Sequence, residues 1–280
     1  MIQDLLLPIT RTKGDDNALA AAVALSAHFG AHLSVLEVIN LPMPFPGPWG
    51  VTPDARMSEV YRDLRDAGAA HAVRLRAQLD KESISCEVRT AESLLTEPPQ
   101  LVALHARYVD FSILPAPAQG ADDAAMARGF FSALLFESGR PVMVVPAHHP
   151  IELPLRHVVV AWQPTREATR ALHDALPLLM GATSVDIVTV DPIVSETRHG
   201  EDPGVDIASH LARHDLSVNV VVLPHRGERV ATTLLRHAAE SGAQLFVAGG
   251  YGHSRFREWV LGGTTRELLQ AMHLPILFSH

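Results

Sequence analysis

Residues 247–265 read VAGGYGHSRFREWVLGGTT, an apolar run followed by a glycine-rich loop and the start of a helix. The run Leu245–Ala248 predicts a buried strand, and Gly249 and Gly252 come directly after it. Glycine tolerates positive φ and lets the backbone approach a ligand closely. The pair 262–263 then opens a predicted helix, whose free N–H groups favour an anion. The pattern predicts a phosphate cradle; the alternative is a turn that only packs a helix against a sheet.

The predicted helix carries its own start signal. Thr264 and Glu267 have the spacing of a capping box, so Thr264 is the expected N-cap of a helix that runs to Met272. The basic side chains in and beside the loop favour a small polyanion; they are His253, Arg255, Arg257 and Arg266. The alternative is a solvated helix face whose arginines pair with Glu258 and Glu267. The candidate ligand contacts of this region are therefore Gly249, Gly252, His253, Arg255, Gly262, Gly263 and Thr264.

The spacing Gly-x2-Gly-x9-Gly after the penultimate strand of an α/β unit resembles the nucleotide motif of the universal stress protein (UspA-like) family. The closing segment 275–278, PILF, is similar to the last strand of that family. This resemblance implies an adenine nucleotide alpha hydrolase-like fold that binds ATP, ADP or AMP, with Mg²⁺ as a candidate companion ion. In ATP-binding members a serine or threonine hydroxyl follows the last glycine, and Gly263 replaces it here.

Short apolar runs alternate with amphipathic segments along the chain, and the pattern restarts after a proline-containing linker at 146–154. Such alternation predicts right-handed βαβ units and parallel sheets. We therefore expect two tandem Rossmann-like domains, at residues 1–147 and 154–280. Each is expected to hold a five-stranded parallel sheet with helices on both faces.

The two halves differ at the glycine motif. When Pro141 is aligned with Pro275, the three glycines of the motif correspond to Pro115, Ala118 and Arg128. Proline and alanine lack the backbone freedom that such a loop requires. The first half is therefore expected not to hold phosphate, and at most one nucleotide is expected per chain.

Further ligand candidates lie at other carboxyl ends of the second half, where open α/β sheets bind ligands. Gln163 follows the first strand of that half, where the family usually carries an aspartate; its amide can both donate and accept. Val190 and Asp191 stand at the end of the next strand, where the family lines the adenine pocket, so both are eligible for ligand contact. Gly227 follows His225 and Arg226, in a loop similar to one that precedes a helix in the family. Ordinary loop positions explain Gln163 and Gly227 as well.

Composition excludes several classes of protein. A net charge of −8 argues against a general nucleic-acid binder. The sequence contains no run of about 18 apolar residues, so no membrane span is expected. The first residues lack the features of a signal peptide. The one cysteine, Cys86, fits a reducing compartment, so a cytoplasmic location is expected. The 16 histidines show no metal-ligand spacing, and no catalytic residue is assigned.

Three functions remain open. The first is a stress-response protein that senses an adenine nucleotide through its C-terminal domain, with little or no turnover. The second is a scaffold or protein-interaction module in which both nucleotide sites are degenerate. The third is a weak ATPase or a protein that phosphorylates its own Thr264 or Thr265. Efficient hydrolysis needs Mg²⁺ ligands and a positioned water, and the sequence reveals no such set.

The closing strands of the two halves, 142–145 and 276–278, are apolar. An apolar strand at a sheet edge must be covered. We expect these strands to pair with each other in an intramolecular pseudo-dimer, or with a second chain in a homodimer.

Overall fold

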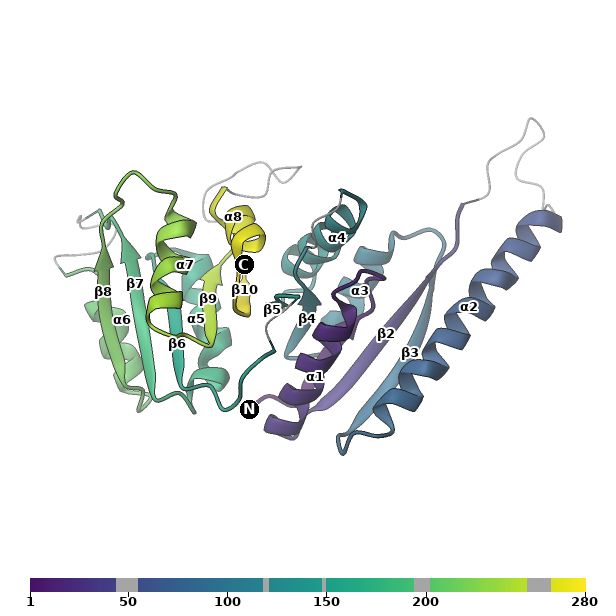
Figure 1. The fold of residues 1–280 in the computed structure, drawn as a ribbon, viewed down its shortest axis with the longest axis horizontal. Helices are drawn as coiled ribbons and strands as arrows, with labels where there is room; N and C mark the ends of the chain where they lie inside the picture. The colour runs from purple at the N-terminus through teal and green to yellow at the C-terminus, as the bar shows by residue number, and fades with distance from the viewer. Residues whose placement is uncertain (44–54, 118–120, 148–149, 194–201, 251–262) are drawn as a thin grey trace.

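The structure is a computed structural model, and it describes residues 1–43, 55–117, 121–147, 150–193, 202–250 and 263–280. Strands alternate with helices along the chain, and this alternating series occurs twice, once in each half (Figure 1). The elements of the first half are β1 (Asp4–Pro8), α1 (Asp15–Phe29), β2 (His32–Asn40), α2 (Ala55–Leu79), β3 (Cys86–Ser93), α3 (Pro98–Ala106), β4 (Phe111–Pro115), α4 (Ala121–Glu137) and β5 (Val142–Val145).

The second half repeats this order from residue 157. Its elements are β6 (His157–Ala161), α5 (Arg166–Leu179), β7 (Ser184–Val190), α6 (Val205–Ala212), β8 (Val218–Leu223), α7 (Val230–Glu240), β9 (Leu245–Gly249), α8 (Gly263–Ala271) and β10 (Ile276–Ser279). The α/β fold class, with parallel strands in each half and helices on both faces, is confirmed. The division at residues 1–147 and 154–280 stays a prediction.

The two halves share one continuous sheet. Its strand order is β3-β2-β1-β4-β5-β10-β9-β6-β7-β8, and the strands within each half pair in parallel. At the centre β5 and β10 pair antiparallel, with Ile276 opposite Val144 and Phe278 opposite Val142. The expected pairing of the closing strands within the chain is thus confirmed, and it buries both strands completely.

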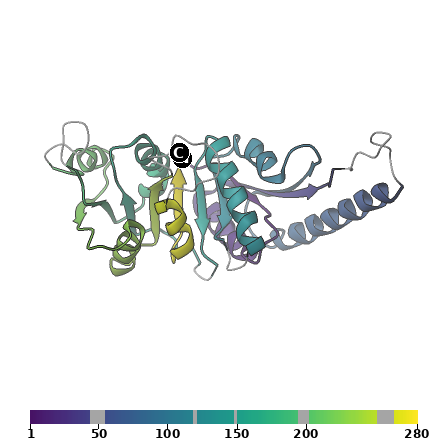
Figure 2. The same ribbon diagram turned by 90° about the horizontal axis from the view of Figure 1, so that it is seen from above.

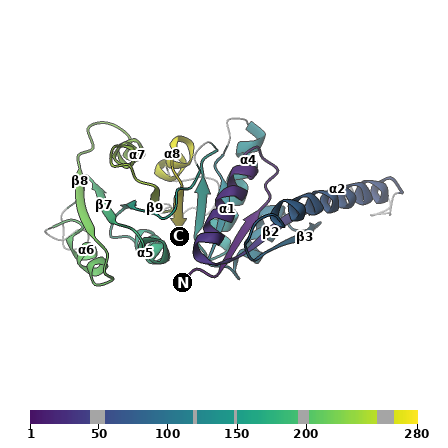
Figure 3. The ribbon, with the colours of Figure 1, turned by 60° about the horizontal axis from the view of Figure 1, so that its bottom comes forward.

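Helices cover both faces of this sheet, as Figure 3 shows for α5 and α6 on one side and α7 and α8 on the other. Side chains of α1, α2, α5 and α6 build one hydrophobic cluster, and those of α3, α4, α7 and α8 build a second. The long helix α2 extends away at one end of the molecule (Figure 2). In the part of the chain that the structure describes, no helix is both long and apolar enough to cross a bilayer.

The first strand and helix of each half are joined differently. In the first half the loop 9–14 separates β1 from α1, and Arg11 adopts a left-handed conformation (φ 61°). The Arg11 guanidinium pairs with the buried carboxylate of Glu37. The second oxygen of this carboxylate, Oε2, accepts a hydrogen bond from His71 Nδ1 at 2.8 Å. In the second half the loop is shorter, and Thr165 caps α5: its Oγ1 accepts from the N–H of Ala168 at 3.3 Å.

Candidate functional site

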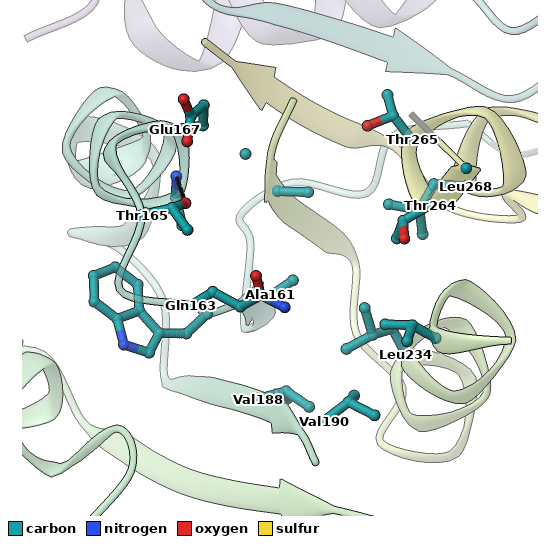
Figure 4. Close-up of a pocket in the computed structure, with 16 residues that line it drawn as sticks. Ala161, Gln163, Thr165, Glu167, Val188, Val190, Leu234, Thr264, Thr265 and Leu268 are labelled. Atoms are coloured by element: carbon teal, nitrogen blue, oxygen red, sulfur yellow. Dashed lines mark hydrogen bonds between the residues drawn. The ribbon is translucent and has the colours of Figure 1, made fainter. Parts of the chain in front are cut away.

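A pocket of about 330 Å³ lies at the carboxyl ends of β6, β7 and β9 in the second half (Figure 4). Helices α5, α7 and α8 supply the rest of its wall. This is the edge at which open α/β sheets bind ligands, and the volume is at the small end of the range for ligand sites, roughly 300–1,000 Å³. Its lining residues are Ala161, Trp162, Gln163, Thr165, Glu167, Ala168, Val188, Val190, Val230, Leu234, Ala248, Gly249, Gly263, Thr264, Thr265 and Leu268.

One side of the pocket is apolar. Val188 and Val190 are two residues apart on β7, so both side chains point to the same face of the sheet. Leu234 of α7 lies on the same side of the cavity as these two valines in Figure 4. A flat aromatic ring fits such a surface, because its burial removes apolar area from water.

The opposite side is polar. Thr165 and Glu167 at the start of α5 lie on one side of the cavity, and Thr264 and Thr265 at the start of α8 lie on the other (Figure 4). The first residues of two helices, α5 and α8, therefore line the same cavity. Such N-termini favour anions.

The charged side chains of the pocket do not match a phosphate. Among the described lining residues, Glu167 is the one ionisable group, and its carboxylate repels an anion. Among the described lining residues, a field that favours phosphate comes from the two helix starts. In the described residues no group of three or more His, Cys, Asp or Glu side chains is arranged to hold a metal ion.

Gly249 has a structural reason to be glycine. A Cβ at this position would lie 2.6 Å from the backbone N of Ala168 and 2.6 Å from the carbonyl carbon of Glu167. The end of β9 thus packs directly against the first turn of α5. Gly263 is different, because a Cβ there would meet nothing within 4 Å among the neighbouring atoms.

In the first half, the equivalent close contact between a strand end and a helix start has its glycine on the helix side. Pro115 ends β4 where Gly249 ends β9, and it lies against Gly14, the N-cap of α1: a Cβ on Gly14 would be 2.5 Å from Pro115 Cβ. The small residue at this contact is thus the strand residue Gly249 in the second half and the helix-cap residue Gly14 in the first. The contrast between Pro115 and Gly249 therefore has a packing cause that is independent of any ligand.

The expected capping role of Thr264 is wrong. Helix α8 already includes Gly263, so Thr264 lies inside the first turn. Glu267, the expected capping-box partner, forms an ion pair with Arg229 at 3.3 Å instead. The exposed hydroxyl of Thr264 is at the pocket wall, whereas Thr265 is buried.

The structure brings together five of the predicted site residues: Gln163, Val190, Gly249, Gly263 and Thr264 all line the pocket. Gly227 does not line it; this glycine adopts φ 79° in the loop between β8 and α7. The remaining predicted residues lie outside the described part of the chain, namely Gly252, His253, Arg255 and Gly262.

Several lining residues were not predicted from the sequence. Thr165 had a detectable signal, because a threonine directly before an amphipathic helix is a typical N-cap. Trp162, Val188 and Leu234 had none beyond apolarity, since their positions depend on how β6, β7 and α7 come together.

Comparisons with known proteins agree on the fold. No family model and no curated protein matches the sequence. The structure resembles that of a universal stress protein from Archaeoglobus fulgidus DSM 4304, with a TM-score of 0.72 and 16% identity over 99% of this chain and 95% of that chain. A functionally unknown protein from Pseudomonas aeruginosa PAO1 has a TM-score of 0.59 and 13% identity, over 99% of this chain and 92% of that one.

A third structure, from Pseudomonas aeruginosa UCBPP-PA14, is described as a candidate universal stress protein. Its TM-score is 0.59 and its identity 15%, and the match covers 99% of this chain and 93% of that chain. All three matches span both halves. The chain therefore has the universal stress protein fold, in two tandem copies.

Proposed function

We propose that the C-terminal half binds an adenine nucleotide in the pocket between β6, β7, α7 and α8, and that the bound state carries a cytoplasmic stress signal with little or no turnover. The observation that supports this most directly is the arrangement of the pocket. An apolar surface on β7 and α7 faces two helix N-termini across a cavity of about 330 Å³.

This arrangement orients the nucleotide. The adenine ring would lie on Val188, Val190 and Leu234, and the phosphates would approach the starts of α5 and α8. Gln163 would bond the ribose or the base edge through its amide. Thr264 would supply the hydroxyl that Gly263 lacks. Gly252, His253, Arg255 and Gly262 remain part of the proposed site from their place in the sequence.

A scaffold without nucleotide is the second candidate. Two observations favour it: the packing of Gly249 against Ala168 explains that glycine without a ligand, and the carboxylate of Glu167 lies at the phosphate end of the pocket. The scaffold predicts that the purified chain neither carries nor binds adenine nucleotides.

The decisive measurement is calorimetry of the full chain with ATP, ADP and AMP, together with mass spectrometry of protein denatured directly from cells. One nucleotide per chain supports the proposal. No binding by the parent protein overturns it in favour of the scaffold. Release of ADP over hours of incubation with ATP would support the weak ATPase instead.

A matched pair of variants locates the site. Val190 and Val38 occupy equivalent places: each lies two residues beyond the last residue of its strand that pairs with the opening strand of its half, and both are partly buried. Val190→Trp fills the pocket and should weaken binding at least tenfold, whereas Val38→Trp should leave affinity unchanged. Equal effects of the two substitutions would place the nucleotide elsewhere.

A further inference from the structure

Asp191 follows the last residue of β7 and has a left-handed backbone, with φ 40°. A Cβ makes this conformation unfavourable, and aspartate and asparagine are the side chains that tolerate it best. Such residues persist where the surrounding structure holds them, and they gather at ligand sites. Within the described residues, only Arg11 and Asp215 share this property among those other than glycine.

The side chain of Asp191 is committed to one contact. Its Oδ1 accepts a hydrogen bond from the backbone N–H of His225 at 2.9 Å, across 34 residues of sequence. The backbone N–H of Asp191 donates to the carbonyl of Leu223 at 3.0 Å. These two bonds fasten the end of β7 to the end of β8 and to the loop that follows it.

Both fastened segments belong to the pocket. Val190, directly before Asp191, lines it, and so does Val230, the first residue of α7 after the loop. At its far end the same loop is held by Arg229, whose Nη1 lies 3.3 Å from Glu267 Oε1 on α8. The loop is thus tied to β7 at one end and to α8 at the other.

The first half lacks this device. The residue equivalent to Asp191 is Ile39, which stays in the β2 ladder opposite Glu92. There β2 continues to Asn40, whereas β7 ends at Val190 and turns. Among the described residues of the first half, no aspartate has a left-handed backbone.

From this geometry we propose that Asp191 is a positioning residue: by holding the β8–α7 loop it keeps the α7 wall of the pocket in its binding conformation. The inference rests on the proposed function as regards the ligand, because it assigns Asp191 a share of the nucleotide affinity. We call the two bonds of Asp191, to His225 and to Leu223, the clamp; it is present in the protein without ligand.

Three substitutions of Asp191 separate the effect of its side-chain hydrogen bond from the effect of its left-handed backbone conformation. Asp191→Asn keeps an Oδ1 acceptor and tolerates positive φ. Asp191→Gly removes the bond but relieves the backbone. Asp191→Ala removes the bond and keeps the unfavourable conformation.

The affinity of each variant for ATP, ADP and AMP is measured by calorimetry and its stability by thermal melting. The affinity of the Asp191→Asn variant should match that of the parent within about twofold. Gly should bind about tenfold more weakly, because a tenfold smaller competent fraction raises the apparent Kd tenfold, while its melting temperature stays at or above the parent value. The Asp191→Ala variant should have both a weaker affinity and a lower melting temperature than the parent. Parent-like affinity of Gly and Ala overturns the proposal, and so does a loss of affinity that only follows the melting temperature.

Hydrogen exchange of the ligand-free protein tests the clamp separately. Exchange of the amides from His225 to Val230 should rise in the Gly and Ala variants and not in Asn. Unchanged exchange overturns the clamp whatever the binding data show. If exchange rises but the parent binds no adenine nucleotide, the clamp stands, and both the proposed function and the affinity assigned to Asp191 are wrong.

Discussion

The rings of Phe131 on α4 and Phe278 on β10 meet edge to face, with centroids 5.2 Å apart and planes at 79°. Both side chains are fully buried, and each belongs to a different half of the chain. The contact between the halves is therefore built like a domain core and not like a wet interface between loosely associated domains.

A double-mutant cycle should detect this contact. Phe131→Leu and Phe278→Leu should each lower the free energy of unfolding, and the pair should show a coupling of about 0.5–1.5 kcal/mol, the typical value for an aromatic pair. Urea denaturation of the four proteins measures it. Additive effects would mean that the rings contribute only through burial.

An added methyl group should destabilise the fold at one of the two described glycines of the pocket and not at the other. Gly249→Ala should destabilise the fold by about 1–3 kcal/mol, the usual cost of forcing atoms into a packed site, because its Cβ meets the backbone of Ala168 at 2.6 Å. Gly263→Ala has open space and serves as the control. Thermal melting without ligand decides; equal melting temperatures would show that β9 and α5 can separate at little cost.

Two threonines of the pocket differ in their structural role. Thr165→Ala removes the side-chain cap of α5 and should cost about 1 kcal/mol. Thr264→Ala, inside the first turn of α8, should change stability by less than about 0.5 kcal/mol, as surface substitutions generally do. Chemical denaturation of both variants checks this, and a larger loss for Thr264→Ala would restore its role as a cap.

Acid should weaken the contact between α5 and α6. The ring of His210 lies near those of His173 and His214, with centroids 5.4 and 4.9 Å apart. Burial, and then the charges of His214, His173 and Arg213, lower the pKa of His210 from 6.5. The unfolded chain therefore binds this proton more readily, so the free energy of unfolding should fall as the pH drops below about 6.5 toward the folded-state pKa.

His210→Phe keeps a ring at this position and removes the titrating group. Denaturation midpoints between pH 5 and pH 8 should depend less on pH in this variant than in the parent. An identical slope for the two proteins would assign the acid sensitivity to other groups.

The strands were predictable because each is a short apolar run with a turn signal at its end. Leu5–Leu7 and Val158–Val160 are fully buried, as their composition indicates. The pairing of Val144 with Ile276 was also predictable in kind, since apolar edge strands need a partner.

The start of α8 was not predictable, because the spacing of Thr264 and Glu267 has two explanations. A capping box and a glutamate that pairs with Arg229 from another helix look the same in one dimension. The shape of the pocket has a similar limit: Leu234 and Val190 come from segments 44 residues apart, and only tertiary packing brings them together. The left-handed backbone of Asp191 likewise accompanies a bond to His225, 34 residues further along the chain, which the sequence pattern does not reveal.

The central place of β10 has a consequence for biosynthesis. This strand is the last of the ten to leave the ribosome, yet it pairs with β5, which is complete once residue 145 has been made. At roughly 5–20 residues per second, the intervening segment takes on the order of ten seconds to translate. During that time the nascent first half exposes the apolar edge of β5, and a neighbouring nascent chain or a chaperone can bind there before its own partner strand arrives.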